Sequence, residues 1–203
     1  RGLLGLPLEG LAVSGAVPMG TVTFLFTDLA GSTRLWEEHT AAMKPALARH
    51  DEILRAAVAA HGGHIVKSTG DGVHAAFATA HDALEAAVTA QLALAAEPWG
   101  ATGPLLVRMG IHSGPAEMRD GDYYGTAVNR AARLMSAAQG GQIVVSLATA
   151  ELVKDSGVEL LDLGEHALRD LARPERVFQV VHPGLPCEFA RLSSLDAFPG
   201  NLP

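Results

Sequence analysis

Cysteine is almost absent from the sequence, whose 203 residues include only Cys187. A single thiol cannot form an internal disulfide, and no CxxC motif provides the spacing of a zinc site. His61 and His64 flank two glycines without a third ligand nearby, so we assign no zinc there either. A chain with one free thiol suits a reducing compartment, and we expect a cytoplasmic protein.

Basic residues are also scarce. Fifteen Lys and Arg stand against 22 Asp and Glu, which gives a formal net charge of -7 and a pI near 5.7. Binding to nucleic acid or to an anionic membrane surface depends on clustered positive charge, and the sequence has no basic patch. We therefore expect this domain to bind no nucleic acid.

No apolar run reaches the length of a membrane span, so we expect no membrane association. The composition is nevertheless 48% hydrophobic, which is enough for one sizeable core. We predict a single domain over residues 20–182. Prolines and glycines interrupt residues 1–19, which we interpret as a linker or an added segment, and residues 183–203 are predicted to be a proline-rich linker.

Hydrophobic periodicity predicts an α/β (α+β) fold. Alternating apolar residues predict a strand at 21–27, and apolar residues at helical spacing predict helices at about 34–61 and 80–96. HIVKST and GVHAAF predict two strands around TGDG, and LLVRMGIHSG predicts a fourth. The order βαββαβ is that of a ferredoxin-like sheet. A loop, MRDGDYYG, a helix at 125–138, a strand GQIVVS, a short helix to about 154 and a terminal β region then form a C-terminal β-α-β extension.

Two carboxylates are predicted to converge at one end of this sheet. Right-handed crossovers place strand 73–77 beside strand 21–27, with the TGDG turn at the same end as Asp28. Asp28 and Asp71 then form a pair of the kind that Mg²⁺ prefers, and Gly31, Ser32 and Thr33 can present backbone N–H groups to a phosphate. From spacing alone, an N-cap and a solvated turn explain the two aspartates equally well.

A second polar set lies on the helix at 125–138, where Asn129 and Arg133 stand four residues apart and so project from one face. Taken alone, they are equally typical of an exposed polar stripe. The segment GIHSG does not form a nucleophile elbow, because His112 occupies the central position where that motif needs serine. We therefore reject serine hydrolysis.

Three segments carry a family resemblance: TFLFTDLAGST, VKSTGDGVHAAF and DYYGTAVNRAAR. Taken in this order, they resemble the catalytic domain of class III adenylyl and guanylyl cyclases, of the bacterial homodimeric type, over roughly residues 20–182. The resemblance implies a palm-type sheet and the conversion of a nucleoside triphosphate into a 3′,5′-cyclic nucleotide and pyrophosphate. It also implies a homodimer with active sites at the interface.

The resemblance implies a metal role for the carboxylates. It makes Asp28 and Asp71 ligands of two Mg²⁺ or Mn²⁺ ions, with the Leu29 carbonyl as a further ligand. Such ions activate the ribose 3′-hydroxyl and hold the triphosphate for in-line displacement, so no protein nucleophile is required.

The resemblance also gives roles to the polar residues of the second set. Asn129 matches the residue that orients the ribose, and Arg133 matches the one that stabilises charge on the α-phosphate. Arg169 stands where relatives carry a basic contact to the triphosphate, although Arg173 and Arg176 lie close by in the sequence.

Lys67 and Asp122 match the pair of residues that selects the base. Lysine can donate to adenine N1 and aspartate can accept from the 6-amino group, whereas guanine reverses the polarity at both positions. ATP is therefore the predicted substrate. The family further implies that Lys67 and Asp71, although close in sequence, serve different active sites of the dimer.

Three alternatives remain open at this point. The protein can be a guanylate cyclase, or a nucleotide-binding sensor with little turnover. An RRM-like RNA-binding module shares the βαββαβ order, but VHAAF lacks the exposed aromatics of the RNP1 pattern. The C-terminal segment also resembles linkers that join cyclase domains to further regulatory domains in bacterial proteins.

Overall fold

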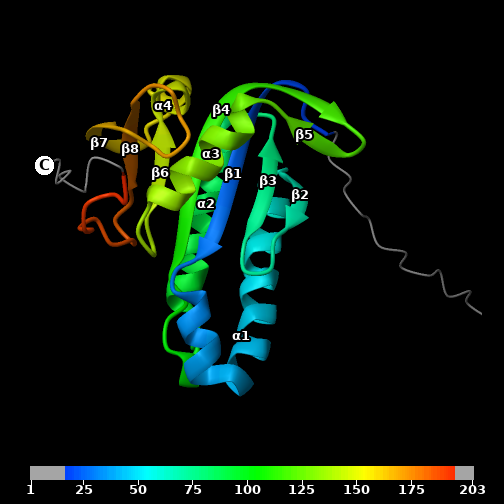
Figure 1. The fold of residues 1–203 in the computed structure, drawn as a ribbon, viewed down its shortest axis with the longest axis vertical. Helices are drawn as coiled ribbons and strands as arrows, with labels where there is room; N and C mark the ends of the chain where they lie inside the picture. The colour runs from blue at the N-terminus through cyan, green and yellow to red at the C-terminus, as the bar shows by residue number, and fades with distance from the viewer. Residues whose placement is uncertain (1–16, 195–203) are drawn as a thin grey trace, which may run out of the picture.

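The computed structural model describes residues 17–194 and contains one eight-stranded mixed sheet with four α-helices (Figure 1). Residues 1–16 and 195–203, which are parts of the predicted linkers 1–19 and 183–203, lie outside the described residues. The elements follow the chain in the order β1 (Gly20–Leu29), α1 (Ser32–Ala60), β2 (His64–Ser68), β3 (Val73–Phe77), α2 (Ala80–Ala96), a 3₁₀ turn (Gly100–Thr102), β4 (Val107–Arg119), β5 (Asp122–Tyr124), α3 (Thr126–Ala137), β6 (Ile143–Ser146), α4 (Leu147–Val153), β7 (Glu159–His166) and β8 (Glu175–Val181).

The predicted sheet is confirmed. The strand order is β2-β3-β1-β4-β6-β8-β7, and β5 pairs only with β4. The first four strands form the ferredoxin-like part, in which β1 lies between β3 and β4 and is antiparallel to both. The C-terminal extension continues this sheet, because β6 pairs with β4 in parallel and β8 and β7 follow beyond it.

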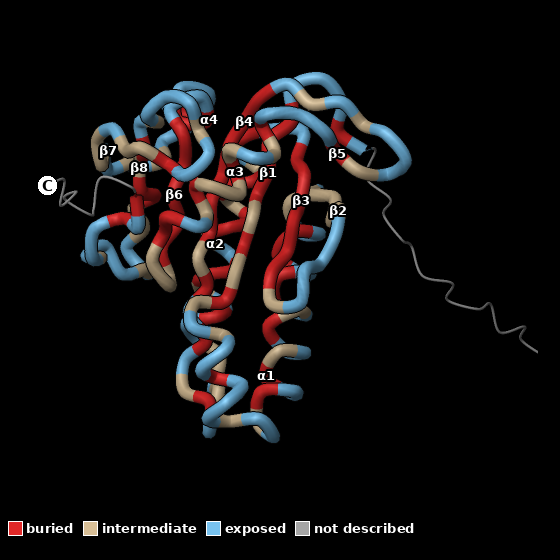
Figure 2. The backbone as a smooth tube through the Cα atoms, viewed as in Figure 1, coloured by how far each residue is buried: buried red, intermediate tan, exposed pale blue. Residues whose placement is uncertain are grey.

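Each face of the sheet buries its own core because successive strand residues point to opposite sides. Leu25 of β1 lies in the larger cluster with Met43 and Leu54 of α1 and Leu84 of α2. Its neighbour Phe24 lies in a second cluster on the opposite face, which includes residues of α3 and β5. Figure 2 shows the buried residues concentrated along the central strands, with exposed residues in the outer loops.

The segment predicted as the loop MRDGDYYG is instead a β-hairpin that extends from the sheet (Figure 1). Strand β4 continues to Arg119, and β5 returns with Met118 opposite Tyr123. The turn residues Asp120 and Gly121 have φ values of 52° and 79°, as a two-residue hairpin turn requires. The Asp-Gly dipeptide was therefore a usable signal for this hairpin.

Part of the C-terminal segment predicted as a linker packs against the domain. We call residues 187–194 the C-terminal strap. Leu192 is 4% exposed and lies in a cluster with Leu134 of α3 and Val177 of β8. The Ser193 N–H donates to the carbonyl of Ala137 at 2.9 Å, so the strap is tied to the last residue of α3.

Within residues 17–194, no helix combines the length and hydrophobicity needed to cross a bilayer.

Leu192→Asp is expected to lower the free energy of unfolding by about 2–4 kcal/mol, because it removes a buried leucine and places a carboxylate among apolar side chains. Urea titration followed by circular dichroism measures this change. The matched control is Ser193→Asp, which adds the same charge at an exposed neighbouring position and is expected to have an effect below about 0.5 kcal/mol. Equal effects of the two substitutions would mean that the strap contributes no packing.

Candidate active site

The two predicted carboxylates lie at adjacent positions, as the topology predicts. Asp28 is near the end of β1, and Asp71 is in the turn between β2 and β3. The Leu29 N–H donates to the Asp71 carbonyl at 3.2 Å, which joins the strand end to the turn. Gly72 allows this close approach, because a Cβ there would lie 2.1 Å from the Thr27 carbonyl oxygen. Backbone packing therefore fixes the relative position of the two aspartates.

The Asp28 carboxylate is paired with Arg108, a residue that sequence analysis missed. The two residues are directly opposite each other in the β1–β4 register, and their side chains are 25% and 31% exposed, respectively. Only the strand register reveals this pairing. The guanidinium places a positive charge against the carboxylate, while Asp28 keeps part of its surface open to solvent.

The donor set fits a hard cation. Within residues 17–194, no group of three or more His, Cys, Asp or Glu side chains gathers around a common point. Asp28 and Asp71 thus form a set of two carboxylates, which suits Mg²⁺ because this ion commonly takes its remaining ligands from water and substrate phosphates. Leu29 follows Asp28 in sequence and its N–H donates to the Asp71 carbonyl, so the Leu29 peptide group lies beside both aspartates.

The start of α1 adds hydrogen-bond donors to this end of β1. Gly31 is the residue before the helix and has a φ of 70°, and Ser32 and Thr33 form the first turn. That turn contains no acidic residue and no side-chain cap, so its N–H groups are free of the usual capping carboxylate. A helix N-terminus of this kind favours anionic groups such as phosphate.

Lys67 and Asp122 form an ion pair at the edge of the sheet. Lys67 Nζ of β2 lies 2.7 Å from Asp122 Oδ2 of β5, although the residues are 55 positions apart in sequence. The hydrogen bond from Lys67 is the main reason why the pKa of Asp122 is below its usual value. Tyr123 adds a backbone N–H to Asp122 Oδ1 at 2.9 Å. The pair is therefore charged and remains accessible, with side chains 51% and 35% exposed.

Helix α3 carries Asn129 and Arg133 on the face of the sheet opposite α1 and α2. Asn129 is exposed, and Arg133 Nη2 lies 2.5 Å from Asp170 Oδ2 in the β7–β8 connection. Arg169 is the exposed neighbour of Asp170. The helix sits close to β4 because residue 110 is glycine, where a Cβ would lie 2.2 Å from the Met135 nitrogen.

The predicted residues thus form three separate groups in one chain. Asp28 and Asp71 share one end of the sheet, Lys67 pairs with Asp122 at its edge, and Arg133 is held by Asp170. No hydrogen bond or ion pair described for residues 17–194 connects the carboxylate pair to α3. In one chain the two sets are held by different partners, Asp28 by Arg108 and Arg133 by Asp170.

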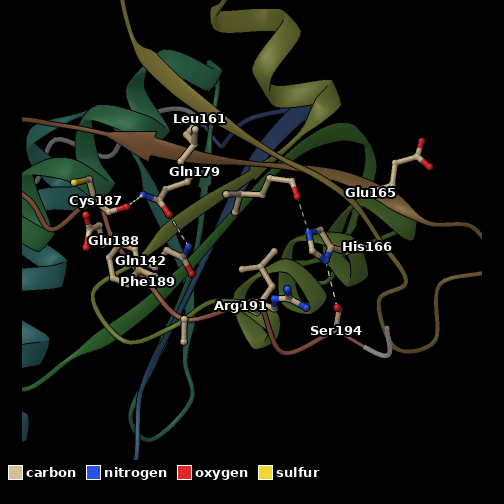
Figure 3. A pocket seen from close by; sticks show the side chains of 13 residues that line it. Gln142, Leu161, Glu165, His166, Gln179, Cys187, Glu188, Phe189, Arg191 and Ser194 are labelled. Carbon is tan, nitrogen blue, oxygen red and sulfur yellow. Dashed lines mark hydrogen bonds between the residues drawn. The ribbon is translucent and has the colours of Figure 1, made fainter. Parts of the chain in front are cut away.

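One cavity is at a different place from the predicted site residues. It has a volume of about 660 Å³ and lies between β7, β8 and the C-terminal strap (Figure 3). Gln142 donates to Gln179 at 2.7 Å, and Gln179 donates to the Cys187 carbonyl at 2.8 Å. These polar groups of the cavity wall thus form hydrogen bonds with one another. None of the predicted site residues lines this cavity. This cavity is therefore separate from the candidate site.

Comparisons with known proteins identify the family of the chain. A family model described as the adenylate and guanylate cyclase catalytic domain matches residues 15–181. An uncharacterized protein of Mycobacterium tuberculosis is 38% identical over 199 residues, which cover 96% of this chain and 67% of that protein. A solved structure of adenylate cyclases from Trypanosoma brucei in their monomeric state is 26% identical, has a TM-score of 0.81 and covers 90% of this chain and 98% of that one. The adenylyl cyclase CyaB from P. aeruginosa is 31% identical, with a TM-score of 0.72 and coverage of 80% and 94%.

Proposed function

The chain belongs to the adenylate and guanylate cyclase catalytic domain family, and from this premise we propose that it converts ATP into 3′,5′-cyclic AMP and pyrophosphate. Domains of this family bind a nucleotide substrate, and its members include dimeric forms. We place the active sites at the interface of a homodimer, as the family resemblance implies. The contact between Lys67 and Asp122 is the observation that favours ATP.

Base selection follows from the polarity of this pair. Lys67 donates a hydrogen bond to adenine N1, and Asp122 accepts one from the 6-amino group. Guanine presents a ring N–H and a carbonyl at these positions. Lys67 would then face another donor, and Asp122 would face another acceptor. The ion pair of the free chain keeps the two side chains charged and close together, ready to exchange one partner for the base.

Asp28 and Asp71, with the Leu29 carbonyl, are the residues that hold two Mg²⁺ or Mn²⁺ ions in this proposal. When bound, such ions activate the ribose 3′-hydroxyl and neutralise charge on the triphosphate. The backbone N–H groups of Gly31, Ser32 and Thr33 contribute donors for phosphate oxygens at the start of α1. The chain itself supplies negative charge for the cations and dipoles for the phosphates.

Helix α3 supplies the remaining groups in this proposal. Asn129 orients the ribose, and the Arg133 guanidinium stabilises the charge that develops on the α-phosphate. When substrate binds, Arg133 leaves Asp170 and contacts the phosphate. Asp170 is thus the partner of Arg133 in the free chain. Arg169 follows directly in the same connection and contacts the outer phosphates.

The test is to incubate the purified protein with ATP or GTP in Mg²⁺ or Mn²⁺ and to identify the products. We expect cyclic AMP to form at least several-fold faster than cyclic GMP, because Lys67 and Asp122 match the edge of adenine. Equal or GTP-favoured turnover would contradict the choice of substrate and favour a guanylate cyclase. Nucleotide binding without cyclisation would indicate a sensor.

Lys67→Glu extends this test to the base contact. Loss of a charged hydrogen bond is expected to reduce kcat/KM for ATP by about 10- to 100-fold. The matched control is Lys44→Glu, the same charge change at an exposed position of α1, which is expected to leave ATP kinetics unchanged. Unchanged kinetics in Lys67→Glu would remove Lys67 from the site.

A further inference from the structure

His74 is a buried polar residue, the second residue of β3, and lies across from Lys67 of the proposed base-selecting pair. Its side chain is 1% exposed, and its ring stacks on Phe26 with centroids 4.2 Å apart and planes 21° from parallel. In the sheet register His74 is opposite Phe26 on one side and opposite Lys67 on the other. Cross-strand neighbours of this kind have adjacent side chains on the same face.

Neither ring nitrogen of His74 has a hydrogen-bond partner within residues 17–194. The other two buried histidines each have a bonded Nδ1, to Ser146 Oγ at 2.7 Å for His112 and to Asp51 Oδ1 at 3.0 Å for His50, whose Nε2 is also unpartnered. A buried polar atom without a partner destabilises a folded chain, and such groups are uncommon in native structures. The two unpartnered nitrogens of His74 therefore lower the stability of the folded chain, and packing alone does not explain why a histidine stands there.

Lys67 and Asp122 both contribute to the electrostatic surroundings of His74. Burial is the main cause that lowers the pKa of His74 to about 4, while the Asp122 carboxylate raises it and the Lys67 ammonium lowers it. The ring is therefore neutral at neutral pH and offers one donor and one acceptor. Aromatic contacts also connect His74 to Tyr123, the neighbour of Asp122. The centroid of the Phe24 ring lies 5.6 Å from that of His74 and 5.1 Å from that of Tyr123.

We propose that His74 is a positioning residue for nucleotide-base selection, whose ring N–H holds the Asp122 carboxylate after Lys67 has turned to the base. This inference rests on the proposed function. In the free chain, Lys67 donates to Asp122 Oδ2. When adenine binds, the Lys67 ammonium donates to the base instead of to Asp122. The Tyr123 N–H is then the remaining described hydrogen bond that orients the Asp122 carboxylate. His74, directly across from Lys67, carries the nearby unused donor.

The test compares His74→Leu with wild type in stability and in kinetics. Leucine fills the site without unpartnered nitrogens, so the midpoint of thermal unfolding is expected to stay equal or to rise. The KM for ATP is nevertheless expected to increase about 5- to 20-fold, with little change in kcat, and the preference for ATP over GTP is expected to fall by a similar factor. His74→Gln keeps a donor and is expected to recover part of the preference.

His112→Leu is the matched control, because it removes a buried histidine whose ring is hydrogen-bonded. It leaves the buried Ser146 hydroxyl without this partner, so it is expected to lower the unfolding midpoint and to leave the KM for ATP unchanged. The two substitutions thus have opposite expected effects on stability and on substrate binding.

An unchanged KM and an unchanged nucleotide preference in His74→Leu would overturn the inference. A fall in its unfolding midpoint with unchanged KM would assign His74 a structural role and would also overturn it. If wild type cyclises neither ATP nor GTP, the proposed function fails independently, and the dissociation constant of a fluorescent ATP analogue then provides the comparison. Equal dissociation constants for wild type and His74→Leu, or no binding to either, would overturn the inference in that case.

Discussion

Replacing Asp71 with asparagine is expected to reduce cyclase turnover by at least about 100-fold while the protein remains folded. Asparagine keeps the size of the side chain but removes the charge that a divalent cation requires. The fold contact at this position is made by the Asp71 backbone carbonyl, which accepts from the Leu29 N–H and is unaffected by the substitution. Initial rates of cyclic AMP formation at saturating Mn²⁺, together with circular dichroism, measure the two properties.

Asp155→Asn is the matched control, since Asp155 is exposed beyond α4 and the substitution removes the same charge. Its turnover is expected to equal that of wild type. Asp71 is a cleaner test than Asp28, because loss of the Asp28 carboxylate also leaves the guanidinium of Arg108 without its partner. Full activity of Asp71→Asn would mean that the cations bind elsewhere.

Mixing two inactive variants is expected to restore activity. In the proposed homodimer, each site takes its carboxylates from one chain and Asn129 and Arg133 from the other. Asp71→Asn and Arg133→Ala homodimers each have two defective sites, and the loss in the second is expected to be about 100- to 1000-fold. A mixed dimer has one site with both lesions and one site with none. With free exchange at equal concentration, activity is expected to recover to about a quarter of wild type.

The same experiment has an internal negative control. Lys67 and Arg133 are supplied by the same chain to the same site in this proposal, so mixing Lys67→Glu with Arg133→Ala leaves one lesion in every site of every mixed dimer. No recovery is expected from that mixture. Subunit exchange is followed independently with differently tagged chains. Exchange without recovery in the Asp71 and Arg133 mixture would place both residues in the site of one chain and contradict the proposed interface.

The strand order and the helix positions were predictable because they follow from hydrophobic periodicity and chain connectivity. The crossover rule also placed the TGDG turn beside the end of β1, and there Leu29 bonds to Asp71. Arg108 was not predictable, because its pairing with Asp28 depends on the exact register of β1 and β4. Periodicity assigns residues to a face of a strand but does not choose which residue of the next strand stands opposite.

Two other features were missed for different reasons. The β4–β5 hairpin carried a recognisable signal in Asp120–Gly121, but its short second strand has too few residues for a clear alternation. The C-terminal strap carried no periodic signal, because it is held by a single buried leucine, Leu192, by one backbone hydrogen bond to Ala137 and by side-chain hydrogen bonds from Gln139 and Gln179. The proximity of Lys67 and Asp122 followed only from the family resemblance, since 55 residues separate them.

The two-residue turn of the β4–β5 hairpin also limits how this part of the gene can change in length. Side chains alternate between the two faces of a strand, so one codon inserted or deleted between Arg119 and Asp122 would turn the Asp122 carboxylate away from Lys67. Substitutions outside the Asp120–Gly121 turn, where the positive φ values restrict the choice of residue, leave this geometry in place. Among descendants of this sequence, we expect the hairpin to accumulate amino-acid replacements while insertions and deletions gather in other surface connections.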